Sequence, residues 1–167
     1  RIAYIAETGP KGKRVKRLAI MDSDGANHRF ITNGQSTALT PRFSPNYKSI
    51  LYLSYVDGNP RIYVYDIDGG RQRLITQSRN PTFAPRWSPD GQTILYSMAV
   101  AGNTDVYKIS ATGTGTPVKL TSAPGIDVGG SFSPDGRQVV FESDRGGNQQ
   151  IYVMNADGSN QRRISFG

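Results

Sequence analysis

The sequence predicts an all-β chain, a β-propeller made of four-stranded antiparallel blades. Three observations lead to this prediction. A Ser-Pro pair begins at Ser44, Ser88 and Ser133, a period of 44 to 45 residues; the same order of apolar and turn segments follows each pair; and no window shows a helical apolar period. Self-similarity at this period is typical of propeller blades. We therefore expect one domain over residues 1–167, with blade repeats at about 1–32, 40–76, 84–121 and 129–165.

The first two strands of each copy are predicted from residue type. An arginine or a small residue and then an aromatic precede each Ser-Pro pair, which fits a brief inner strand near a crowded axis. An apolar run rich in β-branched and aromatic residues follows, and such a run between turn signals is typical of a buried strand. These runs are Ile2–Ala6, Ile50–Tyr55, Thr93–Met98 and Val139–Ser143.

The third and fourth segments are more polar, as strands further from the axis should be. The third segments are Arg17–Asp22, Arg61–Asp66, Asp105–Ser110 and Gln150–Asn155, and the fourth end at Thr32, Thr76, Thr121 and Ser165. Asp-Gly pairs between third and fourth segments predict tight hairpins. Ser-Pro-Asp-Gly predicts a turn between the first and second strands at Ser88 and Ser133. The copy at Ser44 has Asn46 and Tyr47 instead, so we expect a different turn there.

The count of strands predicts an open arc. The first copy lacks its inner strand, and no further Ser-Pro segment follows Ser165 to supply one. We expect three full blades and one partial blade, whose two terminal apolar faces are covered by further chain, a second copy or another molecule. The chain starts in mid-blade with Arg1 rather than methionine, so we expect a mature or excised piece whose targeting segment lies upstream.

Net charge and composition limit the classes of binding partner that we expect. The net charge is +7 and the pI about 9.8, which would suit nucleic acid. However, five basic residues gather in one hairpin loop and the others are scattered, mostly beside acids. We expect a solvated loop, with an acidic partner surface as the alternative, and no nucleic acid. There is no run of 18 apolar residues, so no membrane span is expected. The loop residues are Lys11, Lys13, Arg14, Lys16 and Arg17.

No pattern predicts catalysis. His28 is the one histidine, and Gly130-Ser131 lacks the flanking glycines of a nucleophile elbow. The acidic pattern at Asp22 and Asp24 lacks the glutamate that closes a calcium loop. Cysteine is absent, which excludes disulfides and thiolate metal sites. We expect no catalytic residue, no metal site, no cofactor and no hydrolase activity.

The repeats FSPDGRQVVFESDRGGNQQIYVMNADGSNQRRIS and RWSPDGQTILY, together with the opening RIAYIAETG, resemble the propeller repeats of the TolB family. The resemblance implies a noncatalytic, periplasmic, six-bladed propeller of the Tol-Pal system that binds the lipoprotein Pal, with other Tol proteins and colicins as further partners, and that supports outer-membrane integrity and cell division. Related repeats occur in prolyl-oligopeptidase-like enzymes. A substrate-gating propeller of a serine peptidase is therefore the alternative.

Strand order predicts where a partner binds. The loops that enter the inner strands, Ser36–Thr40, Asn80–Ala84 and Gly125–Gly130, should share one end of the propeller and expose apolar residues. The resemblance places the family's Pal and colicin contacts near Pro81, Ala84 and Val128. Arg42 and Arg86 could attract an acidic partner or form structural ion pairs. The predicted partner-binding residues are Leu39, Arg42, Pro81, Thr82, Phe83, Ala84, Arg86, Ile126, Asp127 and Val128.

Overall fold

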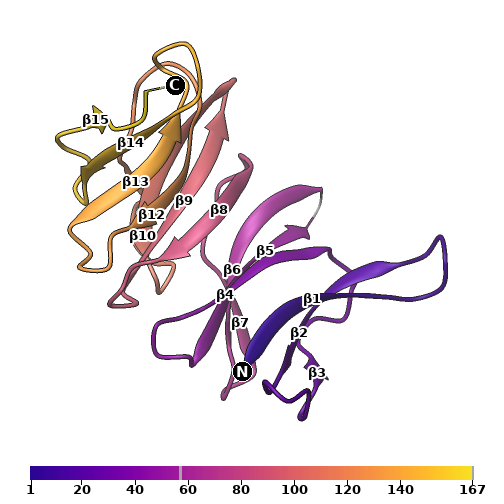
Figure 1. The fold of residues 1–167 in the computed structure, drawn as a ribbon. Helices are drawn as coiled ribbons and strands as arrows, with labels where there is room; N and C mark the ends of the chain where they lie inside the picture. The colour runs from indigo at the N-terminus through magenta and orange to yellow at the C-terminus, as the bar shows by residue number, and fades with distance from the viewer. Residues whose placement is uncertain (57, 167) are drawn as a thin grey trace.

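The computed structural model describes residues 1–56 and 58–166, and this part of the chain consists of strands and the loops between them (Figure 1). The strands form four antiparallel sheets, one of three strands and three of four strands. No helix long and apolar enough to cross a bilayer occurs among these residues. The prediction of an all-β chain of four-stranded blades is confirmed.

The sheets follow one another along the chain and are named here blades 1 to 4. Within each sheet the strands pair in sequence order, so every blade is a simple meander. Blade 1 lacks an inner strand, as the sequence predicted. The strands are β1 (Ile2–Thr8), β2 (Val15–Met21) and β3 (Arg29–Phe30) in blade 1; β4 (Ala38–Phe43), β5 (Ser49–Val56), β6 (Asn59–Asp66) and β7 (Arg71–Leu74) in blade 2; β8 (Thr82–Trp87), β9 (Thr93–Val100), β10 (Asn103–Ser110) and β11 (Val118–Lys119) in blade 3; and β12 (Asp127–Phe132), β13 (Gln138–Ser143), β14 (Gln150–Asn155) and β15 (Arg162–Arg163) in blade 4.

The inner strands β4, β8 and β12 are six residues long, longer than the brief strands that the sequence predicted. Each takes in part of the segment expected to be a loop. The reason is a bulge: the pairing register shifts between Leu39 and Arg42, between Phe83 and Arg86, and in the same place in blade 4. A bulge lets a strand bend and continue its pairing on both sides of the extra residue.

The core lies between the blades. In β5, Ile50 and Tyr52 pack toward blade 1, while Leu51 and Leu53 pack toward blade 3. Alternate side chains therefore serve opposite faces, and both faces are buried because a neighbouring blade covers each one. This explains why the second strands are almost continuously apolar.

An aromatic pair crosses the second and third strands of blades 2, 3 and 4. Tyr52 stacks on Tyr63 with ring centroids 5.8 Å apart, and Tyr96 stacks on Tyr107 at 5.7 Å. Burial, with a smaller contribution from Tyr107, raises the pKa of Tyr96 to about 12. The repeated aromatic residues of the second and third strands are thus packing residues.

The ladder of each fourth strand ends two residues before the predicted segment does. Beyond the ladder, the side-chain hydroxyl of the last residue of each predicted segment accepts a hydrogen bond from a backbone N–H of the third strand. This satisfies a donor that the short outer strand leaves open. The bonds are Leu18 N to Thr32 at 3.0 Å, Ile62 N to Thr76 at 3.2 Å, Val106 N to Thr121 at 3.0 Å and Ile151 N to Ser165 at 2.8 Å.

The blades form an open arc. Each inner strand lies against the preceding blade, β4 against β1 and β2, β8 against β5 and β6, and β12 against β8, β9 and β10. Blades 1 and 4 lie at opposite ends of the arc (Figure 1). The outer face of blade 4 accordingly leaves Val140 38% exposed, whereas Leu51 and Leu95, at the same repeat position in blades 2 and 3, are fully buried. The predicted open arc is confirmed, and what covers its terminal faces stays a prediction.

Candidate partner-binding face

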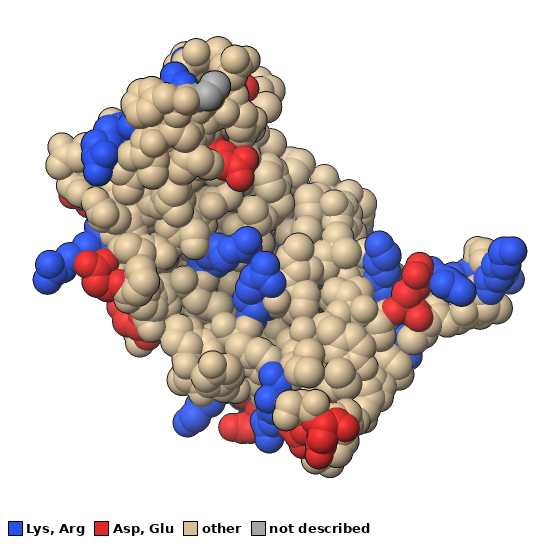
Figure 2. Space-filling model, viewed as in Figure 1, with Lys and Arg blue, Asp and Glu red and all other residues tan. Residues whose placement is uncertain are grey.

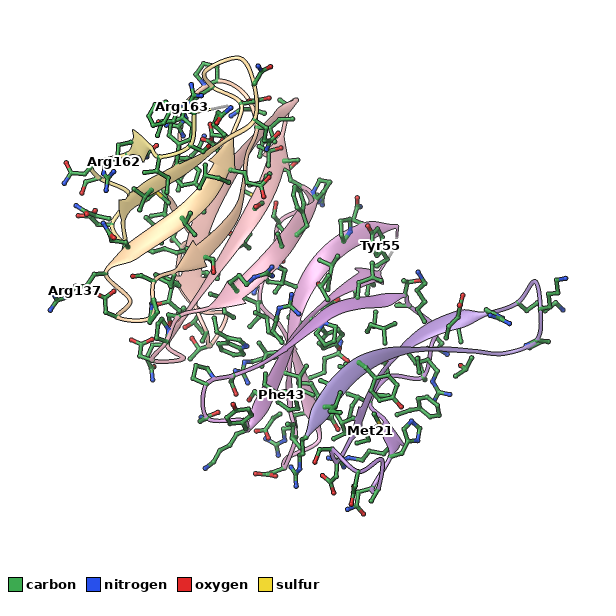
Figure 3. The ribbon with its side chains drawn as sticks, in the orientation of Figure 1. Met21, Phe43, Tyr55, Arg137, Arg162 and Arg163 are labelled. Carbon is green, nitrogen blue, oxygen red and sulfur yellow. The ribbon has the colours of Figure 1, made fainter. Side chains whose placement is uncertain are left out.

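Each blade has two ends that differ in character. At the turn end lie the Ser-Pro turns and the hairpins between third and fourth strands; at the loop end lie segments 33–37, 77–81 and 122–126 and the connections between second and third strands. Figure 3 shows Phe43 and Tyr55 at opposite ends of blade 2, and Arg137 at the turn end of blade 4. The predicted partner face corresponds to the loop end and the neighbouring inner strands.

The Ser-Pro turns share one geometry. In each, the serine carbonyl accepts a hydrogen bond from the backbone N–H three residues on, at 2.9 Å. The prediction of a different turn at Ser44 is wrong, because Tyr47 adopts φ 59° where the other copies place glycine at 72°. Asn46 accepts the serine hydroxyl as Asp90 does in blade 3. The hydrogen bond from the Ser88 hydroxyl is the main cause that lowers the pKa of Asp90.

The first residue of each inner strand is buried rather than exposed. Thr82 shares a hydrogen bond with Thr76 through their hydroxyls at 2.8 Å and donates to the carbonyl of Pro60 at 3.3 Å. Ala38, at the same position in blade 2, packs in the core between blades 1 and 2. The predicted contact residue Thr82 is therefore fully buried and holds the strand in place.

Asp127 occupies the same position in blade 4 and is also buried. Arg145 Nη2 donates to its Oδ2 at 2.7 Å, and the same guanidinium donates to Gln161 Oε1 at 2.7 Å. The guanidinium also lies over the rings of Phe141 and Tyr152, about 5 Å from their centroids. Asp127 is thus half of an internal ion pair that fixes the loop end of blade 4. Nothing in the sequence signals a pair 18 residues apart.

The bulges put one residue of each inner strand in the left-handed region. The φ angles are 48° at Thr40, 51° at Ala84 and 69° at Gly129. A side chain at such an angle costs on the order of 1 kcal/mol, and such strain clusters at functional sites. Sequence reasoning missed the bulges, although Gly129 in the third copy is the signal that could have revealed them.

The apolar positions differ in exposure. Leu39 and Phe83 are half-buried and pack against the core between blades 2 and 3, so they are less exposed than predicted. Val128 and Pro81 are also half-buried. Ile126 is 43% exposed and is the clearest apolar side chain that the loop end offers to solvent.

Arg42 and Arg86 lie on adjacent inner strands. The Trp87 indole N–H donates to the carbonyl of Arg42 at 3.3 Å, which ties β8 to β4. Arg42 Nη1 donates to the carbonyl of Pro41 at 3.1 Å, and Arg86 Nη1 to that of Pro85 at 2.9 Å. Among the described residues neither guanidinium has an acidic partner, so the structural ion pairs that were the alternative for them do not form there. Burial first, and the charge of Arg42 second, lower the pKa of Arg86.

The remaining candidates from the sequence, a catalytic histidine and a cluster of metal ligands, find no support among the described residues. His28 lies beside Tyr4 and Phe30, with ring centroids 6.0 and 4.9 Å away, and lines a pocket of about 340 Å³ whose described lining holds no hydroxyl or thiol nucleophile. Within residues 1–56 and 58–166 no three His, Cys, Asp or Glu side chains gather as metal ligands would. The loop between β1 and β2, which contains Lys11, Lys13 and Arg14, projects away from blade 1 (Figures 1 and 2). The predicted loop residues Lys16 and Arg17 lie in β2 instead, because they pair with β1.

The comparisons with known proteins agree with this architecture. The TolB beta propeller domain family matches residues 1–167. The chain belongs to the TolB β-propeller family. A curated relative, Tol-Pal system protein TolB 1 of Novosphingobium aromaticivorans, is 79% identical over 63 residues, which are 38% of this chain and 14% of the relative. The crystal structure of TolB from Acinetobacter baumannii is 30% identical with a TM-score of 0.81 and covers 98% of this chain.

The chain spans 41% of that Acinetobacter protein, so these TolB proteins are considerably longer. A prolyl endopeptidase structure is also similar, with a TM-score of 0.72 over 99% of this chain, but at 15% identity. That likeness shows a shared propeller fold alone. The family match over the whole chain favours TolB over the alternative of a peptidase propeller.

Proposed function

We propose that this chain is part of a noncatalytic protein-binding propeller of the Tol-Pal system, with the lipoprotein Pal as its partner. The observation that carries the proposal is the match of the TolB propeller family to residues 1–167. The 79% identity to a relative named for the Tol-Pal system supports it. The proposal places the protein in the periplasm, gives it a role in outer-membrane integrity and cell division, and makes other Tol proteins and colicins further partners.

The proposed binding face is the loop end, with the inner strands next to it. Ile126 and Val128 lie there in blade 4, and Pro81 and Ala84 lie at the loop end of blade 3. Half-buried apolar side chains beside strained backbone suit a preformed protein interface, because a partner gains apolar contacts without reordering the chain. Thr82 and Asp127 belong to this face only as buried supports.

The proposal is noncatalytic because the sole histidine has aromatic rings as its ring contacts and no nucleophile in its pocket. An activated nucleophile needs a base within hydrogen-bond reach. Purified protein should not turn over peptide or ester substrates. Turnover that disappears in His28→Ala would contradict this part of the proposal.

The binding face is tested with variants that each introduce one negative charge, either at the loop end or at the turn end of a blade. Ile126→Glu and Ala84→Glu should each weaken the binding of purified Pal at least about tenfold, because a buried unpaired charge costs more than the 1.4 kcal/mol that a factor of ten requires. Isothermal titration calorimetry gives the two dissociation constants, and thermal melts establish that the variants fold.

The matched control is Gln138→Glu, which makes the same charge change at an exposed residue beside a Ser-Pro turn. Gln138 serves better than the nearby Gly136, where φ is 72° and any side chain adds strain. The control should leave Pal affinity unchanged. Equal losses at both ends, or no loss at the loop end, would overturn the assignment.

A further inference from the structure

We propose that Arg42 and Arg86 together form an oxyanion site on the axis side of blades 2 and 3, and that this site takes the carboxylate of an acidic side chain from a peptide segment of a partner. The inference rests on the proposed function in that it names the chemistry of the protein partner. The site itself follows from the side chains of the two inner strands.

The two arginines occupy one repeat position. Each follows a proline and precedes an aromatic residue and a Ser-Pro pair. The bond from the Trp87 indole to the carbonyl of Arg42 fixes the two strands side by side, and the two charges are close enough for Arg42 to lower the pKa of Arg86. Figure 2 shows basic side chains together in the hollow at the middle of this face. Blade 4 has Ser131 at the same position, so the pair is confined to blades 2 and 3.

The charge of the pair is not neutralised within the described part of the chain. Ion pairs there involve other residues, such as Arg145 with Asp127 and Lys119 with Asp105. Arg42 and Arg86 each donate one hydrogen bond, to the carbonyl of the preceding proline. A guanidinium has five N–H donors, so most donors of both side chains are left for a ligand.

Two adjacent like charges without a counter-ion are unfavourable, and an oxyanion between them removes that repulsion. Guanidinium groups bind carboxylate and phosphate through paired, charge-assisted hydrogen bonds. Because Arg86 is partly buried, these bonds form in a medium that screens them less than water does. The site is therefore suited to an anion that enters from the axis.

The surroundings favour a peptide carboxylate over a free anion. Leu39 and Phe83 each lie three residues before an arginine and are partly exposed beside the core. A peptide that combines an acidic side chain with apolar neighbours can use both the arginines and these apolar side chains. A free phosphate would use the arginines alone.

The test uses the full chain and three probes. The first is the tetrapeptide acetyl-Leu-Glu-Leu-Glu-amide, the second its counterpart with glutamine in place of glutamate, and the third inorganic phosphate. Dissociation constants come from calorimetry, and arginine Nε–Hε resonances report which side chains respond. The acidic peptide should bind at least tenfold tighter than either other probe and should shift the resonances of Arg42 and Arg86.

The variant Arg42→Gln/Arg86→Gln should weaken the acidic peptide at least tenfold, while Arg137→Gln, an exposed arginine at the turn end of blade 4 (Figure 3), should leave it unchanged. Arg42→Lys/Arg86→Lys retains the charge and loses the planar fork, so it should lose affinity by several-fold and serves if the glutamine variant does not fold. Unchanged affinity in both variants, or no response of the arginine resonances, would overturn the site. Phosphate binding as tight as the peptide, with the same arginine dependence, would overturn its assignment to a peptide carboxylate.

The same variants separate this inference from the proposed function. Pal binding that is equally tight in wild type and Arg42→Gln/Arg86→Gln would remove the arginine site from the partner interface while leaving the Pal proposal intact. Arginine-dependent binding of the acidic peptide without any binding of Pal would contradict the proposed partner and support the site.

Discussion

The turn end of the blades repeats the same hydrogen bonds from blade to blade, whereas the loop end differs in its residues from blade to blade. At the turn end, each Ser-Pro turn repeats one network in which the serine hydroxyl donates to the residue two positions on. The repeated distances are 2.7 Å from Ser44 to Asn46, 2.5 Å from Ser88 to Asp90 and 2.6 Å from Ser133 to Asp135.

At the loop end the same repeat position holds different chemistry in each blade. Ala38 is apolar, Thr82 joins a hydroxyl pair, and Asp127 joins an ion pair with Arg145. At the turn end, blades 2 to 4 must all reverse direction in the same way, so the residues of the Ser-Pro turns are constrained. The loop end is free to vary once its backbone groups are satisfied. This difference between the two ends is the reason for proposing that partner recognition belongs at the loop end.

The largest effect is expected where the loop end depends on a buried charge. Arg145→Ala leaves the buried Asp127 carboxylate without its cation and should lower the free energy of unfolding by about 3–5 kcal/mol. Removing the exposed Arg14, which lies 3.6 Å from Glu7, should cost less than about 1 kcal/mol. Urea denaturation measures both, and equal losses in the two variants would contradict a specialised loop end in blade 4.

A rise in pH should lower the stability of the protein through the buried tyrosines of the strands, which lie between the two ends. The pKa of Tyr96 is raised to about 12 by burial, and burial also raises that of Tyr52. Between pH 10 and 12 the unfolded tyrosine loses its proton while folded Tyr96 retains it. Stability is therefore full below pH 10 and falls by about 1.4 kcal/mol per pH unit for each such tyrosine. Tyr96→Phe should make this fall less steep in thermal melts at pH 9 to 11, and an unchanged slope would contradict it.

The turn end should respond alike in different blades. Ser88→Ala and Ser133→Ala each remove a hydroxyl that accepts a backbone N–H at 2.9–3.0 Å and donates to an aspartate. Each should cost about 1–2 kcal/mol, because the backbone donor loses its partner. The two losses, measured by urea denaturation, should agree within about 0.5 kcal/mol. A large loss in one blade and none in the other would break the claim that the turn end is uniform.

The smallest expected effect has the opposite sign. Tyr47 is 68% exposed and holds φ 59° where the other two turns have glycine. Tyr47→Gly should raise the free energy of unfolding by about 0.5–1 kcal/mol, because the left-handed strain disappears and the tilted contact with Phe43, 5.8 Å between ring centroids, is a minor loss. Its thermal midpoint should rise by a few degrees. A lower midpoint would show that the ring contact outweighs the strain.

The repeat made the fold predictable, because each copy carries the same spacing of apolar strand and polar turn. It did not reveal the bulges at Thr40 and Ala84, since tertiary packing holds these non-glycine residues at positive φ. The turn at Ser44 was predicted wrongly for a local reason, because the exposed Tyr47 takes the positive φ that glycine supplies in the other two turns. The pairing of Asp127 with Arg145 could not be predicted either, because it depends on which strands meet in space. The strands and loops that carry the proposed partner face could therefore be predicted from the sequence, whereas the burial of Thr82 and Asp127 within it became evident only from the structure.

The most direct test of the loop-end claim is hydrogen–deuterium exchange with and without Pal. Bound Pal should slow exchange in segments 33–42, 77–86 and 122–131, which contain the loops and inner strands. Segments 44–49, 88–93 and 133–138, which contain the Ser-Pro turns, should exchange at the same rate in both samples. Slower exchange confined to the turn segments, or equal slowing at both ends, would contradict the assignment of partner binding to the loop end.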